Sequence, residues 1–443
     1  MARPQQPPLI EPADEWLAHG DLLSLHALNP RRYPHLLQSV GGQGMDILFA
    51  FPDERLAFGP GQGADFLAAL AERVHVAGHA TGTGQGLPFA GGWFLFLGYE
   101  LAAAIEPRLE LPEDPDRLPV AMMEHCPAAF VRDDSGRLWA VAPDRAHLEQ
   151  MREDARAAPG PAEEPGPLAL AGLEEEPPQR FLQGVERIRN YVREGDVFQV
   201  NLSRAWQGRL ADEVDDVALF ARLRATNPAP FAALATWDDR AIVSSSPERL
   251  VRIQGERVET RPIAGTRPRG QNDAEDTGLS AELMAHPKER AEHVMLIDLE
   301  RNDLGRVCRA GTVQVDELMV IESYAHVHHI VSNVSGVLQP GRGAADVIRA
   351  VFPGGTITGC PKVRCMEIIA ELEGTGRGAY TGSLGWLGYN GDMDLNILIR
   401  TLVRTGRDIR FRTGAGIVHD SVPDRELAET RHKAEGLLRM FAR

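Results

Sequence analysis

The chain has 443 residues, more than one typical domain, so we expect two domains or one large composite fold. Its 43% hydrophobic and 25% charged residues are ordinary for a soluble globular protein, and its net charge of −16 argues against a nucleic-acid partner, which requires a basic surface. The four cysteines form no C-x-x-C pair and favour reduced thiols in the cytoplasm. No signal peptide or run of membrane-spanning length is recognised, so we expect a cytoplasmic protein without a membrane partner.

In the first part of the chain, short apolar runs alternate with polar loops. Strands are predicted at residues 45–51, 91–100, 119–130 and 138–142, and a helix at 64–74. Residues 155–179 then become rich in proline, alanine, glycine and glutamate without periodicity, which is typical of a linker or surface loop. We therefore predict an N-terminal portion, residues 1–154, and a C-terminal portion, residues 180–443, although strands of both could share one sheet.

Helical and strand-like patterns alternate through the C-terminal portion. Helices are predicted at 181–194, 214–226, 275–304 with a break at Pro287, 346–352, 362–373 and after Pro423, and strands at 197–205, 231–237, 241–253, 256–262, 380–389, 394–404 and 409–418. Many strands follow one another in hairpin-like succession. This succession favours an α+β architecture with large, mainly antiparallel sheets.

Two predicted helices each carry an E-x-x-E pattern. Glu289 and Glu292 follow Pro287, and Glu426 and Glu429 follow Pro423. Residues at i and i+3 share one helix face. Two such faces suit Mg²⁺, which binds few carboxylates and keeps positions open for substrate oxygens. The ordinary alternative is two solvated helix faces.

A glycine pair ends the last predicted strand. Gly414 and Gly416 flank Ala415, and backbone without a Cβ atom can approach a ligand closely. The ordinary alternative is a pair of turn glycines.

Six segments occur in one order and together carry a family resemblance. They are residues 244–249 (SSSPER), 261–267 (RPIAGTR), 288–293 (KERAEH), 352–362 (FPGGTITGCPK), 398–401 (LIRT) and 414–430 (GAGIVHDSVPDRELAET). In this order they resemble the chorismate-utilising enzymes, which include anthranilate, aminodeoxychorismate, isochorismate and salicylate synthases. The match is dense over residues 180–443 and looser before them. The resemblance implies two mainly antiparallel sheets packed together with helices outside.

The resemblance also implies a magnesium site. Glu292 and Glu429 would hold Mg²⁺, with Glu289 and Glu426 acting through water. Chorismate carries two carboxylates and loses a C4 hydroxyl, so a bound cation could stabilise charge as that group departs.

Further substrate-binding roles are implied for the C-terminal segments. Arg400 and Lys433 would meet the second carboxylate, as a planar fork and a point charge respectively. Tyr380 and the backbone of Gly414, Ala415 and Gly416 would complete that pocket. Without the resemblance, Lys433 would be a surface ion pair and Tyr380 a residue at the edge of the core.

Other implied roles concern the reacting ring. Glu248 would be the general acid for the leaving hydroxyl, a role that needs a raised pKa, and its alternative is a salt bridge with Arg249. His329 would lie near the substrate ring. Thr266, in the Ala264-Gly265-Thr266 run, would hydrogen-bond the substrate or cap the turn.

Two positions bear on which reaction runs. Relatives that add water carry a lysine base where this chain has Gln199, and glutamine cannot deprotonate water, whereas ammonia needs no base. Some aminodeoxychorismate synthases carry a nucleophilic lysine where this chain has Ala264, and anthranilate synthases carry alanine there. Residues 227–231 (NPAPF) and 352–373 nevertheless resemble the bacterial aminodeoxychorismate synthases more closely.

From these features we predict amination of chorismate to 4-amino-4-deoxychorismate, with anthranilate synthesis as the alternative. A non-catalytic chorismate- or tryptophan-binding subunit is a third reading. No cysteine lies in a glutaminase-type nucleophile motif, so we expect a separate glutamine amidotransferase, or free ammonium, to supply ammonia. Residues 36–39 (LLQS) resemble a tryptophan-binding segment of relatives, which makes tryptophan a candidate ligand.

Overall fold

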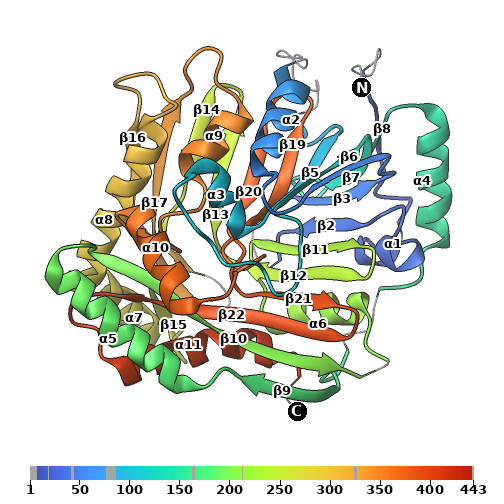
Figure 1. Ribbon diagram of the computed structural model, residues 1–443. Helices are drawn as coiled ribbons and strands as arrows, with labels where there is room; N and C mark the ends of the chain where they lie inside the picture. The colour runs from blue at the N-terminus through green and yellow to red at the C-terminus, as the bar shows by residue number, and fades with distance from the viewer. Residues whose placement is uncertain are drawn as a thin grey trace.

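The computed structural model describes residues 7–17, 19–40, 44–75, 86–161, 165–211, 213–323 and 327–441. Two large β-sheets dominate this part of the chain (Figure 1). Every strand pairing in the described ranges is antiparallel. The predicted α+β class with two mainly antiparallel sheets is confirmed.

The first sheet has twelve strands. In spatial order they are β1 (Leu9–Pro12), β8 (Leu138–Ala142), β7 (Ala128–Arg132), β3 (Asp46–Ala50), β2 (His35–Gln38), β11 (Phe231–Trp237), β12 (Arg240–Ser246), β21 (Thr401–Thr405), β22 (Asp408–Ile417), β10 (Gln199–Leu210) and β18 (Gly359–Cys360), with β9 (Leu170–Glu175) also paired to β10.

The second sheet has ten strands. Their order is β15 (Ile263–Pro268), β17 (Val327–Val337), β14 (Arg257–Thr260), β13 (Arg249–Gln254), β20 (Met393–Asn396), β19 (Ser383–Gly388), β5 (Gly92–Leu97), β6 (Ala121–Cys126) and β4 (Glu54–Phe58), with β16 (Gln314–Ser323) also paired to β17.

The two sheets share an aromatic core. Phe49 of β3 and Phe94 of β5 come from different sheets, and their ring centroids are 5.4 Å apart. Side chains of a strand alternate between its two faces. Ile47 and Phe49 therefore enter this core, whereas Leu48 packs into a separate cluster on the outer face. This double burial explains why β3 is apolar at successive positions.

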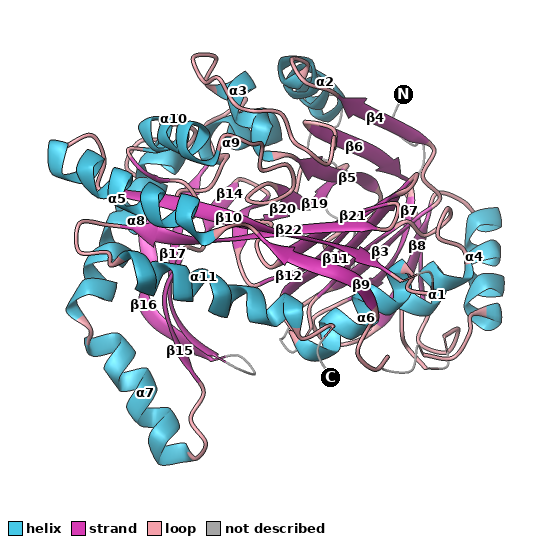
Figure 2. Ribbon diagram, turned by 60° about the horizontal axis from the view of Figure 1, so that its bottom comes forward, coloured by secondary structure: helices cyan, strands magenta, loops and turns pink. Residues whose placement is uncertain are grey.

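Helices cover the outer faces of both sheets (Figures 1 and 2). The first sheet is covered by α1 (Leu23–Leu28), α4 (Arg145–Ala157), α6 (Asp216–Thr226), α5 (Pro178–Glu194), α10 (Lys362–Glu373) and α11 (Pro423–Leu438), and the second by α2 (Gly63–His75), α7 (Asp273–Ala285), α8 (Pro287–Gly305) and α9 (Ala344–Val351). A short segment, η1 (Tyr99–Leu101) with α3 (Ala102–Ile105), follows β5. Among the described residues no helix is long and apolar enough to cross a membrane.

The segment 155–179, predicted as a linker, is only partly loop. It contains the end of α4, strand β9 and the start of α5. Strands from before and after it also share both sheets, since β2 pairs with β11 and β5 with β19. The proline- and glutamate-rich composition concealed β9, whose side chains are mostly exposed, so the strand carries no apolar pattern.

Three predicted strands are each divided between the sheets. Residues 119–130 give β6 in the second sheet and the start of β7 in the first, and the other two divided strands lie near each other. Residues 241–253 form β12 and β13, which belong to different sheets, and residues 394–404 form β20 and β21 in the same way. The two crossings lie side by side, because Ser245 N–H donates to the Arg400 carbonyl at 3.1 Å and Ile397 N–H to the Glu248 carbonyl at 2.9 Å. These adjacent crossings bring Glu248 and Arg400 together.

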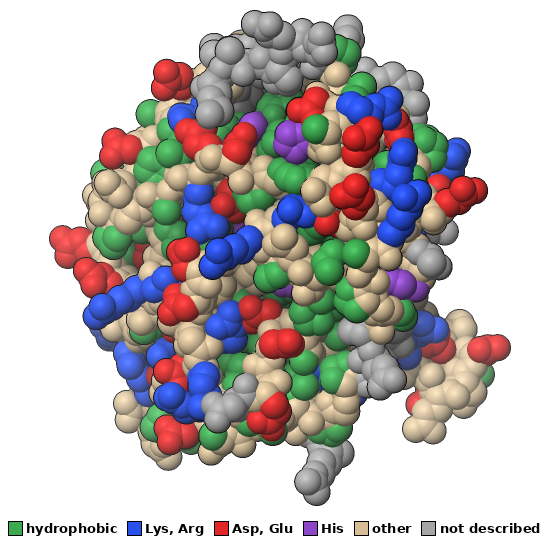
Figure 3. Space-filling view, turned by 90° about the vertical axis from the view of Figure 1, so that its right-hand side faces the viewer, with side chains coloured by type: hydrophobic (Ala, Val, Ile, Leu, Met, Phe, Trp, Pro, Cys, Tyr) green, Lys and Arg blue, Asp and Glu red, His purple; other side chains and the backbone are tan. Residues whose placement is uncertain are grey.

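Charged side chains of both signs are distributed over the surface. On the face shown in Figure 3, basic and acidic side chains are interspersed rather than separated into large areas of one sign.

Candidate active site

Glu248 lies in the first crossing, between β12 and β13. Its side chain is buried and accepts a hydrogen bond from Thr356 Oγ1 at 2.8 Å. Burial raises the pKa of Glu248 to about 7, and the nearby Glu300 carboxyl acts in the same direction. A carboxyl with this pKa can hold a proton near neutral pH and donate it, as a general acid must.

Arg400 lies in the second crossing, between β20 and β21. Its backbone has a φ of 52°, a left-handed conformation that is uncommon for a residue other than glycine. Burial lowers the pKa of its guanidinium, while the Glu248 carboxylate opposes this effect. Within the described part of the chain, the half-buried guanidinium makes no hydrogen bond or ion pair. A cation held in this way is suited to binding an anion.

Gly414 and Gly416 on β22 face side chains of neighbouring elements. A Cβ atom at Gly414 would lie 2.6 Å from Asn201 Oδ1 and 2.7 Å from Tyr380 Oη, and one at Gly416 would lie 2.5 Å from Gln199 Nε2. The glycines are therefore required by these three side chains. The open backbone that the sequence suggested is covered in part by protein atoms.

Asn201 is a candidate binding residue that the sequence analysis missed. Gln199 and Asn201 point to the same face of β10, since they are two residues apart on one strand. Each side chain is at least nine-tenths buried, and among the described residues neither Gln199 Oε1 nor Asn201 Oδ1 has a hydrogen-bond partner. Buried acceptors without donors are unfavourable, so both are placed to accept from a ligand. Because residues two apart on a strand share a face, the prediction for Gln199 could have been extended to Asn201.

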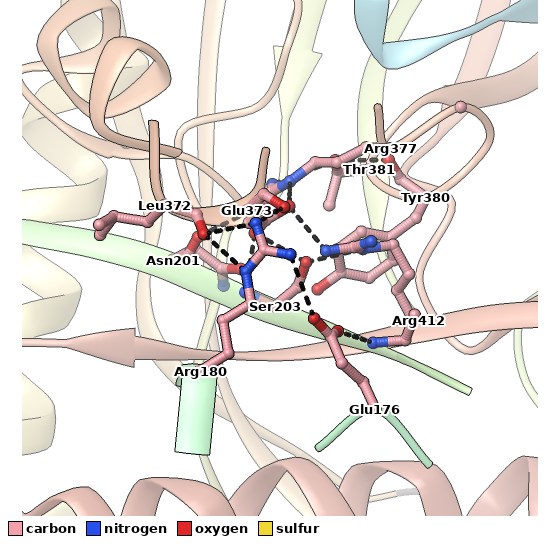
Figure 4. Close-up of polar contacts among 12 residues, drawn as sticks. Glu176, Arg180, Asn201, Ser203, Leu372, Glu373, Arg377, Tyr380, Thr381 and Arg412 are labelled. Carbon is pink, nitrogen blue, oxygen red and sulfur yellow. Dashed lines mark hydrogen bonds and ion pairs between the residues drawn. The ribbon is translucent and has the colours of Figure 1, made fainter. Parts of the chain in front are cut away.

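A buried ion-pair network centred on Glu373 lies next to β10 (Figure 4). Glu373 of α10 accepts hydrogen bonds from Ser203 N–H, Arg377 and Arg412, the two arginine contacts being 2.6 and 2.9 Å long. Burial alone would raise the pKa of Glu373, but Arg377 and Arg412 outweigh it and lower the pKa. The guanidinium of Arg377 also donates to the Asn201 carbonyl and lies 5.3 Å from the Tyr380 ring centre. The network therefore fixes the positions of Asn201 and Tyr380.

His329 and Gly265 lie together on neighbouring strands. In the register of β15 and β17, His329 opposes Thr266, and its Nδ1 lies 3.4 Å from the Gly265 carbonyl. Burial lowers the pKa of His329 to about 4, with Arg400 acting in the same direction, so the imidazole is neutral. A Cβ atom at Gly265 would lie 3.0 Å from Glu289 Oε2, which places α8 against this turn. The side chain of Thr266 is outside the described part of the structure.

The carboxylates predicted to bind magnesium are on α8 and α11. Glu289 lies 3.5 Å from Arg267, and Glu429 lies 2.7 Å from Lys433, whose Nζ also donates to the Gly414 carbonyl. No group of three or more His, Cys, Asp or Glu side chains is placed to hold a metal ion among the described residues. The four carboxylates have the hard oxygen chemistry that Mg²⁺ prefers. Magnesium ligation by Glu289, Glu292, Glu426 and Glu429 stays a prediction.

The fold and this site place a buried carboxylic acid, Glu248, beside the guanidinium of Arg400. The sequence profile of the chorismate binding enzyme family matches residues 33–439, so the chain belongs to this family of chorismate-utilising enzymes.

Known relatives include enzymes of both amination branches. An anthranilate synthase component I-like protein of Synechocystis is 43% identical over 381 residues, covering 84% of this chain and 77% of the relative. Aminodeoxychorismate synthase component 1 of Bacillus subtilis is 56% identical over 259 residues, covering 58% of this chain and 55% of the relative. The crystal structure of anthranilate synthase component I from Streptococcus pneumoniae aligns with a TM-score of 0.79 at 32% identity, over 90% of this chain and 93% of that chain.

Replacing Arg400 by alanine is expected to weaken chorismate binding. The change removes a charged hydrogen-bond donor worth about 1.5–3 kcal/mol, so KM should rise about 10- to 100-fold. Steady-state kinetics and the shift of Tm on adding chorismate measure the effect. Arg209→Ala is the control, since its half-exposed side chain pairs with Asp408 on the surface. An unchanged KM and an unchanged Tm shift in Arg400→Ala would show that the anion binds elsewhere.

Proposed function

We propose that this enzyme aminates chorismate to 4-amino-4-deoxychorismate. The observation that carries the proposal is Glu248, a buried acid with a pKa of about 7 beside the guanidinium of Arg400, which has no ion-pair partner among the residues that the structure describes. The arginine would bind a substrate carboxylate and thereby orient the ring. Glu248 would then protonate the C4 hydroxyl as it leaves, so that water departs instead of hydroxide.

Gln199 supports ammonia rather than water as the nucleophile. Its neutral amide is buried on the face of β10 next to Gly416 and cannot remove a proton from water. Ammonia attacks through its own lone pair. The unpartnered acceptors Gln199 Oε1 and Asn201 Oδ1 can hold the N–H groups of such a nucleophile.

Anthranilate synthesis is the second candidate, and Ala264 favours it. The Ile263 backbone N–H donates to the Glu248 carboxyl, so residue 264 directly follows a contact of the proposed acid. The chain has alanine at this position, as the anthranilate synthases do, rather than lysine. The 56% identity to the Bacillus subtilis enzyme supports the first candidate.

A glutamine amidotransferase is proposed as the source of ammonia. Glutaminase cysteines need a lowered pKa to act as nucleophiles. Burial instead raises the pKa of all four cysteines of this chain: Cys126, Cys308, Cys360 and Cys365. Ammonia must then come from another protein or from solution. Tryptophan binding at residues 36–39 stays a separate hypothesis.

Mg²⁺ is the proposed cofactor, and when bound it would neutralise the ring carboxylate of chorismate. Glu429→Gln should abolish turnover without unfolding the protein, and EDTA should do the same reversibly. Glu435→Gln is a matched control, because Glu435 lies on the same helix and pairs with Arg439 at the surface. Turnover that persists in Glu429→Gln would remove this residue from the metal site.

The product formed from chorismate, ammonium and Mg²⁺ tests the proposed reaction. We expect 4-amino-4-deoxychorismate, detected by mass and by its conversion to para-aminobenzoate when an aminodeoxychorismate lyase is added. Anthranilate fluorescence in the absence of the lyase would instead establish the second candidate.

A further inference from the structure

Glu300 is a second buried carboxyl near Glu248. It lies on α8 with a 6% exposed fraction and accepts hydrogen bonds from Thr260 Oγ1, at 2.8 Å, and from the Gly355 backbone N–H. None of the roles considered above uses this residue.

The Gly355–Thr356 turn connects the two carboxyls. Gly355 binds Glu300, and the next residue, Thr356, donates its hydroxyl to Glu248. A Cβ atom at Gly355 would lie 2.4 Å from Leu299 Cδ2, so α8 packs closely against the turn and a larger residue there would displace the Leu299 side chain. Two adjacent residues of the turn therefore link Glu300 on α8 to the proposed acid Glu248.

The charges around the pair favour its protonated forms. The Glu300 carboxyl raises the pKa of Glu248 and the Arg400 guanidinium lowers it, with the Arg400 effect the smaller of the two. Asp303 raises the pKa of Glu300 and Lys362 lowers it. Lys362 is already bound to Asp303. Burial raises the pKa of Glu248 and of Glu300 to about 7 each.

We propose that Glu300 is a positioning residue for Glu248: it holds the Gly355–Thr356 turn and keeps the neighbouring carboxyl in its proton-bearing form. Two buried carboxyls at short range resist carrying two negative charges together. While Glu300 is present, Glu248 retains its proton to a higher pH. The acid is thereby ready for the leaving hydroxyl under conditions in which ammonia is also present as free base.

The inference rests on the proposed role of Glu248, and the test separates the two. The protonated carboxyl band of Glu248 is titrated by infrared difference spectroscopy without substrate, and Glu248→Gln identifies the band. In parallel, the pH dependence of kcat is measured with chorismate and ammonium. The infrared titration measures the protonation of Glu248 whether or not Glu248 is the general acid. If it is not the general acid, the pH dependence of kcat will not match the infrared titration.

In Glu300→Gln the Glu248 titration and the alkaline limb of kcat should both move down by about one pH unit. Thr260→Val should move them in the same direction, because Glu300 loses a donor that favours its charged form. Thr356→Val should move the Glu248 titration upward, since it removes a donor to that carboxylate. A Glu248 titration that is unchanged in both Glu300→Gln and Thr260→Val would overturn the proposal.

Discussion

Replacing Glu248 by glutamine is expected to lower kcat for chorismate amination by about 10²- to 10⁴-fold, the usual contribution of a general acid. Glutamine keeps the shape of the side chain and can still contact Thr356, but it has no acidic proton for the departing hydroxyl. KM should change little, because Arg400 rather than Glu248 would bind the substrate anion. Stopped or continuous assays at saturating chorismate and ammonium give the result.

The wild-type pH profile provides a linked measurement. The pKa of Glu248 is raised to about 7, so the protonated form that donates is present below this pH and is lost above it. We expect kcat to fall as pH rises through that value, after correction for the ammonia that is available. Glu256→Gln is the control, since its exposed side chain pairs with Arg309 at the surface. Glu248→Gln with wild-type kcat would end its assignment as the acid.

Replacing Glu373 by alanine is expected to destabilise the protein by about 3–5 kcal/mol, the cost of leaving buried charges without their partner. Arg377 and Arg412 would both lose this partner in a site from which water is excluded. Chemical denaturation followed by tryptophan fluorescence measures the loss. Activity should fall as well, because Arg377 contacts both Asn201 and Tyr380.

Glu371→Ala is the matched control for the network. Glu371 lies two residues earlier on α10, and its half-exposed side chain is 3.8 Å from Arg187 and accepts a hydrogen bond from Tyr191 Oη at 2.9 Å. Its loss should cost no more than about 1 kcal/mol. Because the pKa of Glu373 is lowered by Arg377 and Arg412, its stabilisation is present at neutral pH and is lost as the pH falls through the lowered pKa. Equal stability of the two variants would show that the ion pairs contribute little.

The predicted elements were most accurate where one pattern covers one element. The helix after Pro423 was expected from its proline and its charged face, and the structure has α11 there. Patterns that continue through a change of sheet were read as single strands, as at residues 394–404. Where the chain passes from one sheet to the other, it stays extended and apolar, but its hydrogen-bond partners change. Those partners lie far away in the chain, so they leave no local sequence pattern.

The candidate site shows the same division. Glu248, Arg400 and Tyr380 were proposed from ordered motifs, and the structure places all three around the crossings. Asn201 and Glu300 were missed because their significance depends on what surrounds them. An asparagine on a strand or a glutamate on a helix does not indicate a functional site in a sequence. Its role becomes visible only when the structure shows that it is buried and which residues it contacts.

By itself the sequence determined the fold class, many of the helices and strands, and the residue types available for chemistry, since these follow from periodicity and from side chains read one at a time. It did not predict β9, β16 or β17. Only the tertiary structure decided that β12 and β21 turn into the second sheet beside each other, which buries Glu248 next to Arg400. Desolvation and charge proximity set the protonation of an acid, and both depend on atoms contributed by distant parts of the chain.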